Sequence, residues 1–234
     1  MLIGILATGA RNERLSERYG SNAEMLMEAL REVSPAFTFK CFRVRENVFP
    51  DSATACDGWL VTGSDHSVYE ELPWMLKTEE LLRQALAVHR PGGGICFGHQ
   101  LLARGLGGKV VKSEKGWGLG LLSYQLHESG ETVTLPAYHQ DQVVEVPEKA
   151  RLLGGSEFCP HAILAYDNLG LTFQAHPEFS PDYLRVLIEN DMGGKPEYAA
   201  VVDRAQQSIL KETSHAATVS RWIGDFLLQH YKKG

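Results

Sequence analysis

The chain has 234 residues, of which 44% are hydrophobic and 22% charged, and its formal net charge is -6 at pH 7. This length and composition favour one globular domain with a substantial core, spanning residues 1–234. The acidic balance, without a block of lysine or arginine, gives no electrostatic footprint for nucleic acid or an anionic membrane, so we expect neither partner. No apolar stretch approaches the roughly 20 residues that span a bilayer, and we expect a soluble, cytoplasmic protein.

The first half of the chain alternates apolar runs with amphipathic segments. A capping box of Ser21 and Glu24 predicts a helix that ends near Val33. A polar loop is expected between the first strand and Gly20. A stripe of leucines predicts a second helix over residues 74–89. Strands are predicted at residues 1–6, 37–44 and 58–63. This alternation indicates an α/β fold with a mainly parallel central sheet and helices on both faces.

The second half of the chain changes character. Short β-rich runs at residues 109–112, 120–124 and 131–135 are separated by Gly, Pro and charged turns. They predict a small antiparallel or mixed extension beside the main sheet. From residue 180 to 234 the pattern returns to helix, with Pro181 at a first helical position, and predicts a helical C-terminal tail.

One cysteine lies in a setting that favours nucleophilic chemistry. Residues 92–100 read Gly-Gly-Gly-Ile-Cys-Phe-Gly-His-Gln, an apolar run that leads through Cys96 into a helix. Glycines two residues before and two after Cys96 allow a sharp strand-turn-helix bend, which exposes the thiol at a helix N-terminus. The positive end of the helix dipole favours a thiolate there. Cys96 is therefore the candidate nucleophile.

A candidate base and its orienting group follow another apolar run. Residues 174–178 read Gln-Ala-His-Pro-Glu, directly after the predicted strand at residues 169–173. Residues two apart on an extended chain face the same way, so Glu178 can accept one N–H of His176 while the other ring nitrogen faces the thiol. Cys96, His176 and Glu178 form the predicted catalytic set.

Together, the G-I-C-F-G-H-Q and Q-A-H-P-E motifs resemble the class I glutamine amidotransferases, which use a Cys-His-Glu triad. The resemblance spans residues 1–180, and the chain is similar to the glutaminase domain of GMP synthetase. It implies the flavodoxin-like fold of the class I amidotransferases. It also implies an oxyanion hole in which a backbone N–H of Gly63 or Ser64 joins that of Phe97. Such donors would stabilise the charge that develops when an amide is attacked. A simple turn capping a strand is the alternative for residues 63 and 64.

The resemblance implies three substrate contacts. Gln100, one helical turn after the nucleophile, matches the position that holds the substrate glutamine, although a solvated helix amide is an alternative. His139 and Asp141 match an H-x-D segment that lines the cleft of similar enzymes. A second catalytic dyad of these two residues is less favoured because His176 already has Glu178 beside it.

The remaining chemistry-bearing residues give weaker signals. The four cysteines, at positions 41, 56, 96 and 159, lack C-x-x-C spacing, and the other histidines show no paired ligand spacing. We therefore predict reduced thiols, no metal site and no cofactor. The tryptophans are expected in the core. Relatives have an apolar pair where Gly92 and Gly93 stand, so we expect a more mobile elbow or a reshaped pocket.

These motifs predict a cysteine hydrolase that cleaves the γ-amide of glutamine through a γ-glutamyl thioester and releases ammonia and glutamate. No P-loop-like nucleotide-binding motif is present. An amidotransferase would therefore need a separate synthase subunit as its partner. A stand-alone γ-glutamyl peptidase is the first alternative. A non-catalytic binding or regulatory protein of the same fold is the second.

Overall fold

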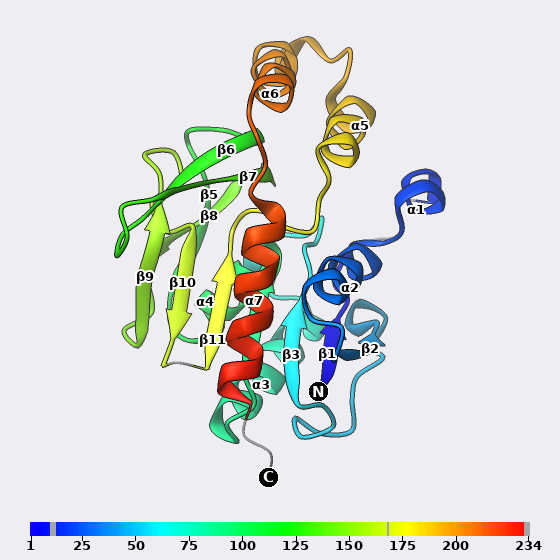
Figure 1. The fold of residues 1–234 in the computed structure, drawn as a ribbon, viewed down its shortest axis with the longest axis vertical. Coiled ribbons are helices and arrows are strands. Elements are labelled where there is room, and N and C mark those ends of the chain that lie inside the picture. The colour runs from blue at the N-terminus through cyan, green and yellow to red at the C-terminus, as the bar shows by residue number, and fades with distance from the viewer. Residues whose placement is uncertain (10–12, 168, 232–234) are drawn as a thin grey trace.

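Parallel strands form the centre of the protein. The structure, a computed structural model, describes residues 1–9, 13–167 and 169–231. Within these residues nine strands form one sheet, in the order β2-β1-β3-β4-β11-β10-β9-β6-β7 (Figure 1). The first five run parallel to one another. They are β1 (Leu2–Leu6), β2 (Thr38–Phe42), β3 (Gly58–Val61), β4 (Gly92–Ile95) and β11 (Gly170–Phe173). The predicted parallel central sheet is confirmed.

The predicted extension is antiparallel and continues the same sheet. It consists of β6 (Gly118–Leu126), β7 (Thr132–His139), β9 (Ala150–Gly155) and β10 (Ile163–Tyr166). A separate antiparallel pair joins β5 (Lys109–Lys112) to β8 (Asp141–Glu145). Strands β8, β9 and β10 were not among the predicted elements, because each is only four to six residues long and is held by its neighbours.

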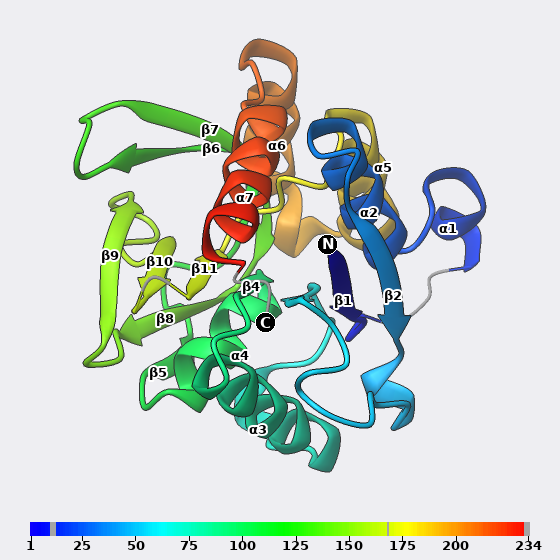
Figure 2. The same ribbon diagram turned by 60° about the horizontal axis from the view of Figure 1, so that its bottom comes forward.

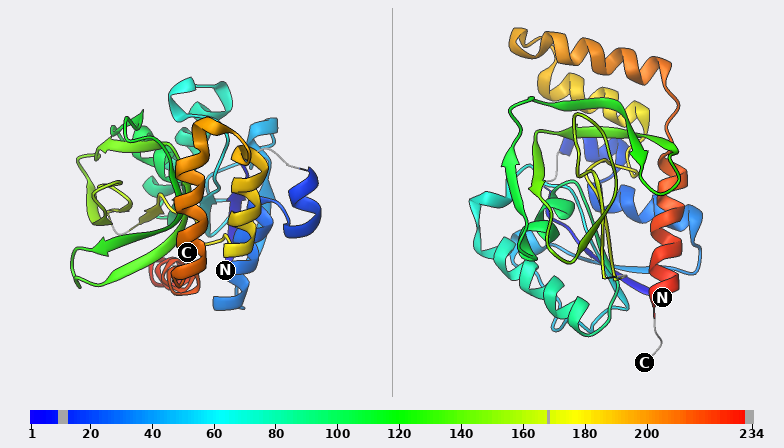
Figure 3. Two further views of the ribbon diagram at one scale, coloured as in Figure 1. Left: turned by 90° about the horizontal axis from the view of Figure 1, so that it is seen from above. Right: turned by 90° about the vertical axis from the view of Figure 1, so that its left-hand side faces the viewer.

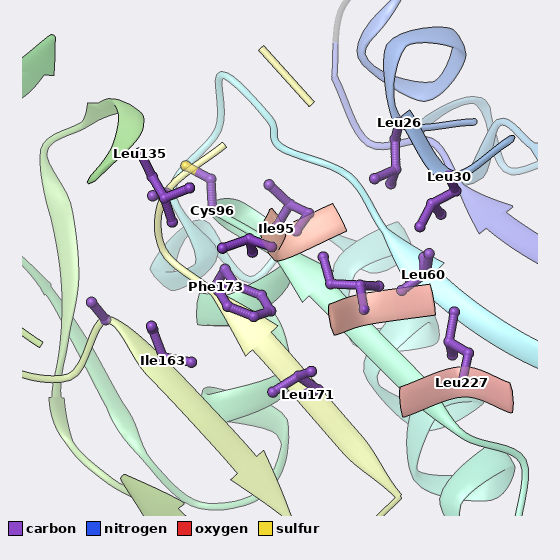
Figure 4. Packing of buried hydrophobic residues seen from close by; sticks show 14 of the residues in the cluster. Leu26, Leu30, Leu60, Ile95, Cys96, Leu135, Ile163, Leu171, Phe173 and Leu227 are labelled. Atoms are coloured by element: carbon purple, nitrogen blue, oxygen red, sulfur yellow. The ribbon is translucent and has the colours of Figure 1, made fainter. Parts of the chain in front are cut away.

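Helices cover both faces of the sheet, as predicted. Helices α2 (Asn22–Val33) and α7 (Ala216–His230) lie on one face, and α3 (Pro73–Ala87) and α4 (Phe97–Gly105) lie on the other (Figure 2). Leu30 of α2 and Leu227 of α7, both fully buried, pack toward β3 and β4 in one continuous core (Figure 4). Burial of these apolar faces fixes the helices on the sheet.

The C-terminal region adds a helical pair beyond the sheet. Helices α5 (Pro181–Met192) and α6 (Ala199–Lys211) lie together at one end of the molecule (Figure 3). Their apolar side chains form a separate core cluster with Leu119 and Leu121 of β6. The described part of the chain also contains three short 3₁₀ helices, η1 (Val44–Glu46), η2 (Val68–Glu70) and η3 (Pro196–Tyr198).

The polar loop predicted before Gly20 is wrong over residues 13–19. Residues 10–12 lie outside the described residues, but Glu13–Tyr19 form helix α1. Leu15 is 5% exposed and belongs to the cluster beneath α5, and the ring of Tyr19 packs edge-on against Tyr183 at 5.2 Å. Tertiary contacts therefore stabilise a helix that is too short and polar to be recognised from sequence.

Candidate active site

Cys96 occupies the turn between β4 and α4. Its backbone has φ 51° and ψ -102°, a region that costs about 1–3 kcal/mol for a non-glycine residue. The flanking glycines make this turn possible. A Cβ on Gly94 would lie 2.3 Å from the carbonyl carbon of Gly98, and a Cβ on Gly98 would lie 2.5 Å from the Val61 oxygen. The strained turn holds Cys96 at the carboxyl end of the parallel sheet.

Of the two glycines that depart from the family pattern, Gly93 is closely packed, whereas a Cβ on Gly92 would make an ordinary contact, 3.6 Å from the Trp59 oxygen. A Cβ on Gly93 would lie 2.6 Å from the carbonyl oxygen of Leu171 and 2.7 Å from Cδ2 of Leu60. Strand β4 is also paired on both sides, to β3 and to β11. Neighbouring atoms therefore fill the space that a side chain at Gly93 would take.

His176 and Glu178 follow β11 and form a buried pair. The His176 Nδ1 atom lies 2.8 Å from Glu178 Oε1, and the side chains are 4% and 1% exposed. The imidazole stacks on the ring of Phe179 with centroids 4.0 Å apart and an interplanar angle of 7°. The backbone N–H of His176 donates to the carbonyl of Pro136 over 2.8 Å. These contacts fix the ring in one orientation.

The charge of this pair controls the titration of His176. Burial alone would lower the pKa of His176, but the charges of Glu178 and Cys96 and hydrogen bonds to both raise it to about 10. Nδ1 is directed to Glu178, and Cys96 is close enough to act on the same ring. The structure thus brings Cys96, His176 and Glu178 together. At neutral pH the imidazole is held in its protonated form.

The thiol is more enclosed than the elbow motif suggested. Cys96 is 7% exposed, Gln174 Nε2 lies 3.6 Å from its Sγ, and the carbonyl oxygen of Tyr138 lies 4.0 Å away. Access runs through a cavity of about 340 Å³, which Cys96 lines together with residues from several loops. The prediction of an exposed thiol is corrected to a buried thiol that lines this cavity.

The predicted oxyanion residues meet beside the thiol. A Cβ placed on Gly63 would lie 2.9 Å from His176 Cε1 and 3.8 Å from Cys96 Cβ, so only glycine fits there. Ser64 lines the cavity. Phe97 is 1% exposed and its ring packs against Trp74 with centroids 5.6 Å apart, which leaves its backbone N–H at the first turn of α4 as its polar group.

Two of the three predicted substrate contacts have polar groups at the cavity. Gln100 is 3% exposed, which excludes a solvated helix amide, and its Nε2 donates to the Asp141 carbonyl over 2.9 Å and to Gln174 Oε1 over 3.1 Å. Both amide hydrogens are therefore used within the protein, and the oxygen is left for a donor. The carboxylate of Asp141 accepts the Tyr69 hydroxyl over 3.1 Å. Both residues line the cavity.

His139 also lines the cavity, but it is less suited to bind a charged group. It is 3% exposed, and both of its ring nitrogens are buried without a hydrogen-bond partner of good geometry among the described residues. Burial, and then the charge of His176, lower the pKa of His139 to about 3. The ring is therefore neutral at ordinary pH.

The cavity includes residues that sequence reasoning did not assign to the site. Lys112 of β5 lies directly opposite Asp141 in the β5–β8 register, so a cation and an anion stand side by side. Trp117, expected in the core, is only partly buried and lines the cavity instead, with its ring 5.4 Å from that of Tyr138. Tyr138 donates to Asp191 over 2.7 Å. Only the strand register could have revealed that Lys112 lies opposite Asp141, because the two residues are far apart in sequence.

Among the residues that the structure describes, no group of three or more His, Cys, Asp or Glu side chains is arranged to hold a metal ion. Within the same residues, no helix is long and apolar enough to cross a membrane.

Comparison with known proteins identifies the family. The sequence model of class I glutamine amidotransferases matches residues 15–191, which is most of the chain. The chain belongs to the class I glutamine amidotransferase family. The resemblance seen in the two motifs is confirmed, and the chain is an enzyme of this family's type.

Relatives include enzymes with different named activities. Gamma-glutamyl peptidase 3 from Arabidopsis thaliana is 30% identical over 208 residues, covering 82% of each protein. A glutamine-hydrolyzing GMP synthase subunit from Sulfurisphaera tokodaii is 34% identical over 124 residues, covering 50% of this chain and 64% of that protein. The crystal structure of a glutamine amido transferase from Methylobacillus flagellatus has a TM-score of 0.79 at 22% identity, covering 99% of this chain and 96% of its own. The last likeness supports the fold, and the first two are consistent with a hydrolase.

Proposed function

We propose that this enzyme is a cysteine hydrolase that cleaves the γ-amide bond of glutamine or of a related γ-glutamyl compound. The observation that carries this proposal is the convergence of Cys96, His176 and Glu178. Cys96 lines the cavity, the His176 ring and Cys96 both lie against Gly63, and His176 Nδ1 is 2.8 Å from Glu178 Oε1. No cofactor is needed, because the thiolate is itself the nucleophile.

The first half of the reaction forms a thioester. The Cys96 sulfur attacks the γ-carbonyl carbon, and the carbonyl oxygen becomes an oxyanion that backbone N–H groups near Gly63, Ser64 and Phe97 stabilise. The C–N bond then breaks. The raised pKa of His176 keeps a proton available for the departing nitrogen, so ammonia or an amine leaves as a neutral molecule.

The second half regenerates the enzyme. A water molecule gives a proton to neutral His176 and attacks the γ-glutamyl thioester. The C–S bond breaks, glutamate is released, and the Cys96 thiolate again faces protonated His176. Glu178 stabilises the imidazolium in both halves, since its carboxylate accepts a hydrogen bond from the Nδ1–H group throughout.

The cavity also suggests how the amino-acid end of the substrate binds. The carboxylate of Asp141 and the free amide oxygen of Gln100 are acceptors for an α-ammonium group. Lys112, opposite Asp141, is a donor for an α-carboxylate. This arrangement matches a zwitterionic head group, and His139 contributes shape rather than charge.

A stand-alone γ-glutamyl peptidase is the second candidate. Two observations favour it. The cavity of about 340 Å³ is lined by Trp117 and Asp191 as well as by the residues assigned to the head group, so it offers further contacts to a leaving group larger than ammonia. A relative similar along most of its length is named a γ-glutamyl peptidase. The alternative, an amidotransferase subunit that delivers ammonia to a separate synthase, is supported by the more limited likeness to the Sulfurisphaera tokodaii GMP synthase protein.

The deciding experiment measures ammonia, free amine and glutamate released by the purified protein alone. Glutamine, glutathione and γ-glutamyl dipeptides would be compared at equal concentrations. Cys96→Ala tests the nucleophile, and Cys41→Ala, which removes an exposed thiol elsewhere, is the matched control. Faster turnover of γ-glutamyl peptides than of glutamine would identify a peptidase. Weak glutaminase activity that rises with an added synthase would identify a partner-dependent amidotransferase, and equal turnover by Cys96→Ala would reject both.

A further inference from the structure

Two buried threonines surround the backbone of residues 62–64. Thr8 and Thr62 are 0% and 1% exposed. The Thr8 hydroxyl oxygen lies 2.9 Å from the carbonyl oxygen of Thr62 and 3.0 Å from that of Gly63. The Thr62 hydroxyl is 3.2 Å from the Gly63 carbonyl oxygen and accepts the Thr8 N–H over 3.1 Å. Two successive carbonyl groups therefore face the Thr8 hydroxyl, and the second of them, that of Gly63, also faces the Thr62 hydroxyl.

This arrangement fixes the opposite side of the backbone as a donor surface. In a trans peptide, the carbonyl of one residue and the N–H of the next point in opposite directions. With the carbonyls of Thr62 and Gly63 turned to Thr8, the N–H groups of Gly63 and Ser64 both point away from it. Successive N–H groups with a shared direction make a concave site for an anion. Neither N–H has an acceptor among the residues that the structure describes.

The donor surface belongs to the cavity that holds the nucleophile. Ser64 lines this cavity together with Cys96. The Ser64 hydroxyl donates to the Thr8 carbonyl over 2.9 Å, which anchors the third residue of the loop to the same threonine. Beside Gly63, the His176 ring is so close that a Cβ on the glycine would meet it at 2.9 Å.

We propose that Thr8 and Thr62 are positioning residues that hold the N–H groups of Gly63 and Ser64 toward the oxyanion formed on Cys96. The inference rests on the proposed function, because that oxyanion forms only when the thiolate adds to a carbonyl. Without the hydroxyls, the peptides can rotate and turn carbonyl oxygens toward the cavity. An oxygen there repels the developing negative charge that an N–H stabilises.

Threonine-to-valine variants test this, because valine has the shape of threonine without its hydroxyl. Thr8→Val and Thr62→Val are compared with Thr8→Ser and Thr62→Ser, which keep a hydroxyl. Thr78→Val is the matched control, since Thr78 is 0% exposed and its hydroxyl donates to the Trp74 carbonyl over 2.7 Å on α3. Each variant, control or test, loses one buried hydroxyl that hydrogen-bonds a backbone carbonyl, so a general loss of stability from that change is common to all of them.

Two labelling rates of Cys96, resolved by peptide mapping, separate positioning from general damage. The chloromethyl ketone analogue of glutamine reacts through an addition to its ketone that needs the oxyanion donors. Iodoacetamide alkylates the same thiolate directly and needs none. We expect each valine variant to lower ketone labelling and kcat about 10- to 100-fold, with KM and iodoacetamide labelling within about threefold of wild type. The serine variants should recover most of the loss, and Thr78→Val should show none.

Other outcomes overturn the inference. Equal loss of both labelling rates, the same loss in Thr78→Val, or no recovery in the serine variants would each leave the threonines with a structural role only. If one valine variant does not fold, the other provides the same comparison. A wild-type protein that reacts rapidly with the ketone but releases neither ammonia, amine nor glutamate would reject the proposed function, while the ratio of the two labelling rates would still decide the positioning role.

Discussion

The Nδ1 atom of His176 lies 2.8 Å from Oε1 of Glu178, with both side chains almost entirely removed from solvent. The second carboxylate oxygen of Glu178 is buried and has no hydrogen-bond partner among the described residues. The charge of Glu178 is therefore balanced mainly by His176. Strong coupling of this kind makes the protonation of His176 depend on Glu178, and several expected outcomes follow from it and from the surrounding cavity.

Replacing Glu178 with glutamine should lower turnover and move the alkaline limb of the pH profile to lower pH. In the wild type, the proton on His176 is lost only as the pH rises through about 10, so the general acid persists to that pH. Glu178 is the largest influence that raises this pKa, and Glu178→Gln removes its charge. We expect kcat to fall at least 10-fold with a smaller change in KM, measured from pH 6 to 11.

The same pKa predicts the direction of a stability change. The pKa of His176 is raised above its unfolded value of about 6.5, so its contribution to stability is complete below that pH and is lost as the pH rises through about 10. Thermal unfolding of the wild type should show this alkaline loss, and Glu178→Gln should shift it downward. Glu80→Gln, at an exposed ion pair with Arg83, is the control and should leave both profiles in place. An unshifted limb in Glu178→Gln would contradict the coupling.

Replacing Cys96 with alanine should abolish hydrolysis and leave the fold intact. The variant loses one sulfur atom from a largely buried position, for which we expect a stability change of about 1 kcal/mol. Release of glutamate and a thermal unfolding curve measure the two effects. Residual turnover above the uncatalysed rate would exclude Cys96 as the nucleophile.

An electrophilic glutamine analogue should label Cys96 before any other cysteine. Burial raises the pKa of Cys56 to about 11, and burial and then the charge of Cys96 raise the pKa of Cys159 to about 12, so neither forms a thiolate readily. Cys41 is exposed, and small unspecific reagents should reach it. Peptide mapping after treatment with the analogue, and separately with iodoacetamide, would compare how fast each cysteine is labelled. Faster labelling of Cys41 by the analogue would argue against a glutamine site at Cys96.

Replacing Gln100 with alanine should raise KM more than it lowers kcat. The variant removes the amide oxygen that would accept the substrate ammonium, a loss of about 10-fold or more in affinity. It also leaves the Asp141 carbonyl and Gln174 Oε1 without their donor, so the protein should be less stable. Gln84→Ala on α3 removes an exposed amide bonded to Glu80 and serves as the control. A pure loss of kcat would assign Gln100 a different role.

Replacing Lys112 with methionine should weaken binding only of substrates that carry an α-carboxylate. We expect KM for glutamine to rise about 5- to 10-fold, and KM for 4-aminobutanamide, which lacks that carboxylate, to stay unchanged. Lys109→Met on the same strand removes a lysine that pairs with Glu145 at 3.2 Å, and it should affect neither substrate. Equal effects of Lys112→Met on both substrates would reject a carboxylate contact.

Local sequence patterns predicted the parallel half of the fold and the candidate reactive groups. The glycines around Cys96, and the spacing of His176 and Glu178, are local patterns that a turn and a short extended segment require. The capping box of Ser21 and Glu24 likewise forms within one helical turn, and it is present as predicted. Such features depend on neighbouring residues, so they can be read without knowledge of the fold.

Only the tertiary structure decided the features that join distant segments. Leu15 belongs to a helix because it packs beneath α5, and Trp117 lines the cavity because the turn before β6 brings it to Tyr138. Thr8 and Thr62 come together because β1 and β3 are parallel neighbours whose carboxyl ends meet at the same edge of the sheet. In the sequence these two threonines carry no special pattern. Packing alone turns the backbone carbonyl groups that they bind in one direction.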